Sequence, residues 1–135
     1  MAVSANSIVT PQTPKSAMVG VATANTTFTT SPTNTALLLT AGVNGARVTR
    51  IVAVPLETVT ANFLQVYRST DTGTTKYLAA CATGGSDTVS GTDGPSVIDF
   101  GFSEDAPMIL QANERLYVAT GISKSYNFVA DYADY

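Results

Sequence analysis

The residues that most often perform catalysis are scarce in this sequence. It contains no histidine and one cysteine, Cys81, and 13% of its 135 residues are charged. A serine or cysteine nucleophile needs a base beside it, and without histidine only a lysine, a carboxylate or the N-terminal amine remains. Lys76 and Cys81 are an odd number of residues apart on one predicted strand, so they face opposite sides and form no dyad. We therefore expect that the protein is not an enzyme.

Acidic residues are the next candidates for chemistry. Asp87 and Asp93 share a glycine- and serine-rich stretch, and Glu104 is adjacent to Asp105. This spacing matches no EF-hand loop, and a glycosidase would need its carboxylates in a dedicated cleft. The glycines form neither a P-loop nor a dinucleotide-binding pattern. The sequence thus predicts solvated loop acids, with no metal and no cofactor.

The charge pattern limits the possible partners. Seven Lys and Arg stand against ten Asp and Glu, a net charge of −3, and the positive residues are scattered from Lys15 to Lys124. Binding to phosphates requires clustered cations, so we expect no direct nucleic-acid binding. The charged fraction is about half the usual ~25%. Either a partner covers part of the surface, or threonine, serine and asparagine make it polar without charge.

No membrane partner is expected. No apolar run approaches the roughly 20 residues of a membrane-spanning helix. The first residues have neither the positive region nor the apolar region of a signal peptide. A lone cysteine excludes an internal disulfide and suits a reducing cytoplasm. We expect Cys81 to be a small buried hydrophobic residue.

The elements that would position these residues are predicted to be strands throughout. Short runs rich in β-branched and aromatic residues alternate with turn residues at the spacing of about 8–12 residues that is typical of sandwiches and barrels. The clearest is a hairpin in which Ala61–Arg68 and Thr74–Ala80 flank a turn, Ser69–Gly73. The sequence predicts an all-β fold, an antiparallel β-sandwich of the jelly-roll kind, in residues 17–135.

Alternation along the first hairpin strand separates two faces. Leu64 and Val66 share the face that we expect to point into the core. The opposite face carries Phe63 and Tyr67 on either side of Gln65. That face is either a second packing surface or an interface, and we include Phe63 and Tyr67 among the candidate contact residues.

Residues 1–16 differ in composition and are predicted to form an extended N-terminal arm. Pro11 and Pro14 favour an extended backbone and are unsuited to a central strand. The arm is either a frayed terminus or a segment that orders against a neighbouring subunit. In the second case Ile8 and Val9 would anchor it, and all four residues are candidate contacts.

The C-terminal segment is the other predicted contact surface. The last predicted strand, Tyr126–Tyr132, places Tyr126, Phe128 and Tyr132 on one side. Tyrosine suits interfaces because it offers a large area at a low entropy cost. A terminal strand easily abuts a neighbour, so we add Tyr135 to these candidates.

Several segments resemble small structural proteins of tailed bacteriophages. They are Ala5–Lys15, Leu37–Arg47, Val66–Asp71 and Glu114–Val118. The resemblance implies a head decoration or cement protein, which binds the outside of the capsid in the virion and is made in the bacterial cytoplasm. It implies the major capsid protein as partner, and the threefold docking common in such proteins implies a homotrimer. It transfers no functional residues.

We expect the arm, about Ala2–Lys15, to carry much of the capsid contact. Two alternative functions are also compatible with the sequence. One is a tail, baseplate or fibre-associated virion protein with the same fold. The other is a carbohydrate- or receptor-binding module that uses the Gly84–Gly94 loop and exposed tyrosines, although the absence of tryptophan counts against it.

Overall fold

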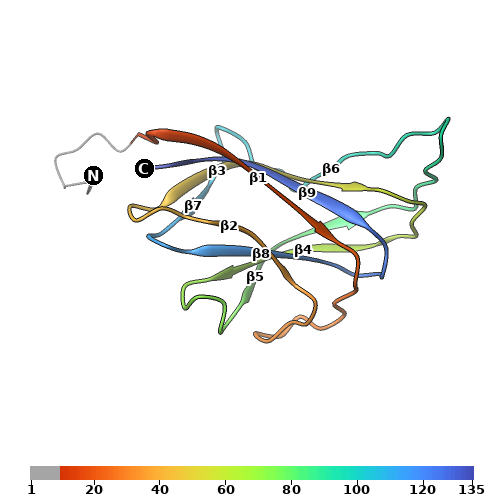
Figure 1. The fold of residues 1–135 in the computed structure, drawn as a ribbon, viewed down its shortest axis with the longest axis horizontal. Helices are drawn as coiled ribbons and strands as arrows, with labels where there is room; N and C mark the ends of the chain where they lie inside the picture. The colour runs from red at the N-terminus through yellow and green to blue at the C-terminus, as the bar shows by residue number, and fades with distance from the viewer. Residues whose placement is uncertain (1–9) are drawn as a thin grey trace.

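The computed structural model describes residues 10–135, and their regular structure consists of strands (Figure 1). The strands in chain order are β1 (Thr13–Val21), β2 (Ala36–Thr40), β3 (Ala46–Pro55), β4 (Asn62–Ser69), β5 (Tyr77–Gly84), β6 (Ile98–Asp99), β7 (Met108–Leu110), β8 (Arg115–Thr120) and β9 (Tyr126–Asp134). Within this part of the chain, no helix has the length and apolar character needed to cross a membrane.

Two sheets pack face to face (Figure 1). The first has the order β1-β9-β3-β6, with β7 also paired to β3, and the second has the order β2-β8-β4-β5. Each of these strand pairs is antiparallel. The predicted antiparallel β-sandwich is therefore confirmed.

The core lies between the sheets and follows the alternation of side chains along each strand. Leu64 and Val66 of β4 are fully buried in it, as predicted. In β3 the register shifts between Val48 and Arg50, and this irregularity allows Val48 and Ile51 both to face the core although they are three residues apart. The core is thus continuous along β3 despite the break in its alternation.

The sandwich begins earlier than the sequence predicted. Thr13–Ser16, which we assigned to the arm, are the first residues of β1 and pair with β9. Pro14 suits this position because β1 is the edge of its sheet, and edge strands are where prolines occur within sheets. The predicted anchors Ile8 and Val9 lie outside the described residues.

Strand β9 occupies a central position, between β1 and β3. Its register is continuous with β1 from Val21 opposite Tyr126 to Thr13 opposite Asp134. A strand with partners on both sides has no free edge. The expectation that the terminal strand would join a neighbouring subunit is therefore wrong for a pairing through a strand edge, while contact through its outer side stays a prediction.

Candidate contact surface

The outer face of β4 is covered by the connection between β1 and β2, residues 22–35. Asn25 Nδ2 donates hydrogen bonds to Gln65 Oε1 at 2.7 Å and to Tyr67 Oη at 2.9 Å. Gln65 Nε2 donates in return to the Asn25 carbonyl oxygen at 3.0 Å. All three side chains are fully buried. Because buried polar groups stabilise a fold only when they are paired, this network fastens the connection to the sheet.

Tyr67 is consequently unavailable as a contact residue. Its hydroxyl donates to Gln65 Oε1 at 2.9 Å, and its side chain has no exposed area. Burial raises the pKa of the Tyr67 hydroxyl above its ordinary value, which keeps it a neutral donor. The prediction that it contributes to an interface is wrong, since alternation along β4 identifies the outer face but not the chain segment that covers it.

Two phenylalanines remain exposed where this cover ends. Phe63 of β4 is 52% exposed, and Phe28, on the covering connection, is 53% exposed. They line the same shallow groove of about 280 Å³, together with Ala61 and Ile122. Alternation along β4 predicts Phe63 as a contact residue but gives no such prediction for Phe28, whose signal is a single aromatic residue inside a threonine-rich stretch.

The outer face continues onto β5. Leu78 and Cys81 lie opposite Tyr67 and Gln65, so they point to the same side of the sheet as those residues. Leu78 is 39% exposed and Cys81 is also exposed. We call Phe28, Phe63, Leu78 and Cys81 the outer patch.

The expected burial of Cys81 is wrong. The residue sits on the outermost strand of its sheet, beyond the segment that covers Gln65. Its remaining partial burial raises the pKa of the thiol above the ordinary value, so the neutral form is favoured at neutral pH.

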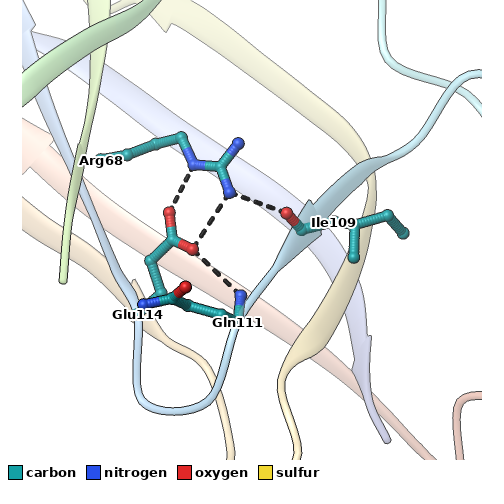
Figure 2. A network of polar contacts seen from close by, with 4 residues as sticks. All are labelled: Arg68, Ile109, Gln111 and Glu114. Atoms are coloured by element: carbon teal, nitrogen blue, oxygen red, sulfur yellow. Dashed lines mark hydrogen bonds and ion pairs between the residues drawn. The ribbon is translucent and has the colours of Figure 1, made fainter.

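One end of the sandwich is held by an ion pair between Arg68 of β4 and Glu114, at the turn before β8. The Arg68 guanidinium donates to both carboxylate oxygens of Glu114 and, at 2.8 Å, to the Ile109 carbonyl oxygen (Figure 2). The backbone N–H of Gln111 donates to Glu114 Oε1 at 3.0 Å. Burial alone would raise the pKa of Glu114, but the bonds from Arg68 and Gln111 outweigh it and lower the pKa.

The predicted aromatic face of the last strand points inward. Tyr126 and Phe128 are fully buried, and the Phe128 ring packs on Phe100 with a centroid distance of 6.3 Å. The Tyr126 hydroxyl accepts a hydrogen bond from Asn62 Nδ2 at 2.9 Å. Their predicted role as interface residues is wrong, because the face that they share is the core face of a central strand.

Three other candidate contact residues lie together near β1, the edge strand of the other sheet. Pro11, Pro14 and Tyr132 line one groove of about 320 Å³ beside Arg47. Pro14 is exposed, and Tyr132 is half-buried, as is Tyr135. These four residues keep part of their surface free for contact, and their predicted role stays a prediction.

The beginning of β1 is fixed beside this groove by an ion pair. Lys15 Nζ lies 2.6 Å from Asp134 Oδ2, and Asp134 Oδ1 accepts the Gly42 N–H at 3.0 Å. Asp134 raises the pKa of Lys15 through this hydrogen bond and its charge. The carboxylate therefore connects β1, β9 and the turn after β2.

Asp87, one of the acidic loop residues, serves local structure. Asp87 Oδ2 accepts the Ser96 N–H at 2.8 Å, and the backbone of Asp87 pairs with Val59. Among residues 10–135, no three His, Cys, Asp or Glu side chains gather in a way that would hold a metal ion.

Comparisons with known proteins add information about the fold. No model of a protein family matches the sequence, and no curated protein matches it. Among solved structures, the chain is similar to that of Eiger TNF from S. frugiperda, with a TM-score of 0.51 and 13% identity, over 93% of this chain and 96% of that one. At this identity the likeness concerns the fold alone, which is a jelly-roll-like β-sandwich.

Proposed function

We propose that this protein is a non-enzymatic structural protein of a tailed bacteriophage, which binds the outside of the capsid and stabilises the head. The observation that carries the proposal is the outer patch, where Phe28 and Phe63 are each about half exposed. Exposed apolar residues that line one groove mark a site of contact. The choice of the phage head rests on the sequence resemblance described above.

A decoration protein would act by binding only to the assembled shell. A ligand that prefers one state shifts the equilibrium toward it, so each bound copy adds to the stability of the capsid. The partner would be the major capsid protein, and the site of action the outer surface of the virion. The homotrimer implied by threefold docking is part of the same proposal.

The test uses shells stripped of the protein and purified full-length chain. We expect the chain to bind these shells and to raise the temperature at which they release DNA. Phe28→Ser and Phe63→Ser together should weaken binding, whereas Met18→Ser, at an exposed site on β1, should leave it unchanged. Failure of the unaltered chain to bind the shells, or its location on the tail of intact particles, would refute the proposal.

The predicted role of the arm, residues 2–15, is best tested by a deletion that ends before β1. Removing residues 2–15 also removes Thr13–Lys15 of β1 and the ion pair between Lys15 and Asp134. Removing residues 2–9 keeps the whole of β1. If the arm carries the capsid contact, the shorter deletion should abolish binding and leave the circular dichroism spectrum of the sandwich unaltered.

A further inference from the structure

The sheet edges of this sandwich differ in how they are protected. Edge strand β1 contains a proline and a lysine, Pro14 and Lys15. Edge strand β2 has five residues and a register break between Leu37 and Leu39. Strands β6 and β7, at the far side of β3, have two and three residues. Proline, charge, irregularity and shortness are the features that keep a sheet edge from pairing with another chain.

Strand β5 carries little of this protection. Its eight residues, Tyr77–Gly84, include no proline and no charged side chain. It pairs with β4 on one side, and within residues 10–135 no strand pairs with its other side. Its one irregularity leaves Ala79 out of the ladder, and the register runs without a break from Ala80 to Gly84. The free edge therefore presents open backbone donors and acceptors along a regular stretch.

Apolar side chains surround this open edge. Tyr77 is 62% exposed at its beginning, and Leu78 and Cys81 of the outer patch follow. Gly84, at its other end, lies against Ile98. The open stretch is therefore Tyr77–Thr83, bordered by exposed apolar surface on its outer side.

We propose that β5 pairs antiparallel with β5 of a second copy across a twofold axis, so that the two four-stranded sheets become one continuous sheet. A twofold interface brings the same segment of both copies together. Because Tyr77–Gly84 has no charge, the pairing places no like charges opposite each other. The cation that precedes the strand, Lys76, would lie at opposite ends of the pair in the two copies.

The twofold axis also joins the two outer patches. In an antiparallel pair related by an axis perpendicular to the sheet, both copies turn the same face outward. Leu78 and Cys81 of one copy then continue the apolar surface of the other. This pairing uses the β5 edges of two copies completely, so it predicts a dimer of the free chain in solution, whereas the homotrimer of the proposed function concerns copies docked on the shell.

The test is the mass of the full chain in solution under reducing conditions, by sedimentation equilibrium. We expect a species of twice the chain mass of 14.0 kDa. Cys81→Lys places a charge at the middle of the edge and should return the mass to that of one chain. Ser16→Lys, at an exposed position of edge strand β1, is the matched control and should leave the dimer intact.

Amide hydrogen exchange provides a second measurement that does not depend on a variant. Of the Ala80–Thr83 amides, those that point away from β4 should exchange more slowly as the protein concentration rises, while the amides of β1 should not change. A single-chain mass at near-millimolar concentration, a trimer, or a dimer that Cys81→Lys leaves intact would overturn the proposal. Slower exchange that appears only on capsid shells would overturn it too, because the occupant would then be a strand of the shell.

The two proposals fail independently. Loss of shell binding with an intact dimer would count against the capsid function alone. A monomer that still binds shells would count against the β5 pairing alone.

Discussion

At the scale of single residues, Glu114 shows how a charge is kept in the interior of this small sandwich. Its side chain is 3% exposed, and its partner Arg68 is 36% exposed. Both carboxylate oxygens accept hydrogen bonds from the Arg68 guanidinium, and one accepts a backbone N–H as well. Removing one member of such a group leaves the other without its partner, which is the main cost of breaking it.

Glu114→Gln should therefore lower the free energy of unfolding by about 1–3 kcal/mol at neutral pH. Because the pKa of Glu114 is lower in the folded protein than its ordinary value of 4.5, the ionised carboxylate stabilises the fold fully above that value. This contribution is lost as the pH falls through the lower, folded-state pKa. Urea unfolding at a series of pH values should show the difference between the two proteins shrinking in acid.

Glu104→Gln is the control for this prediction, since the Glu104 side chain is 79% exposed. Its effect on unfolding should be within about 0.5 kcal/mol. A difference between Glu114→Gln and the unaltered protein that stays constant from neutral to acid pH would contradict the assignment of the stabilisation to the ionised carboxylate.

At the scale of elements, the hairpin of β4 and β5 depends on the conformation of its turn. Gly73 has a φ of +92°, a region that other residues adopt at a cost. A Cβ atom on Gly73 would lie 2.2 Å from the hydroxyl oxygen of Tyr117. Ser69 Oγ accepts the Gly73 N–H at 2.9 Å, and Asp71 Oδ1 accepts the hydroxyl of Ser69 at 2.8 Å. The turn thus combines backbone geometry, close packing and local hydrogen bonds.

Gly73→Ala should destabilise the protein by about 2 kcal/mol or more, because strain at positive φ and the collision with Tyr117 add together. Gly94→Ala, where a Cβ meets nothing within 4 Å, should change the free energy of unfolding by no more than about 0.5 kcal/mol. Thermal unfolding of the three proteins measures both effects. Equal melting temperatures for the two variants would show that the turn tolerates a side chain.

At the scale of the whole molecule, two phenylalanines from the predicted interface have opposite positions. Phe128 is fully buried between the sheets, and Phe63 is 52% exposed on the outside of one of them. The sequence marks both only as aromatic residues on a strand face. Their different environments arise because β9 is a central strand whose inner face meets the other sheet, whereas Phe63 points away from it.

Phe128→Ala should therefore lower the free energy of unfolding by about 3–5 kcal/mol, the usual cost of a large cavity in a core. Phe63→Ala should lower it by less than about 1 kcal/mol. Chemical denaturation of the two variants measures this contrast. Similar losses for both would mean that Phe63 is packed more tightly than its exposure indicates.

The sequence by itself determined the fold class and the hairpin, because alternation and turn residues act between near neighbours. Expected strands at 61–68 and 74–80 correspond to β4 and β5. The second begins three residues later than expected, at Tyr77. One cause is tertiary, since the Lys76 N–H bonds to the carbonyl oxygen of Thr30, far away in the sequence.

Only the tertiary structure decided which faces are covered and which strands lie at an edge. Tyr67 is buried by the connection between β1 and β2, and Cys81 is exposed on an edge strand. Strand β9 is enclosed between two neighbouring strands. Each of these outcomes depends on contacts between segments distant in the sequence. Local alternation assigns a residue to one side of a strand, but the order of strands and the path of connections decide what that side meets.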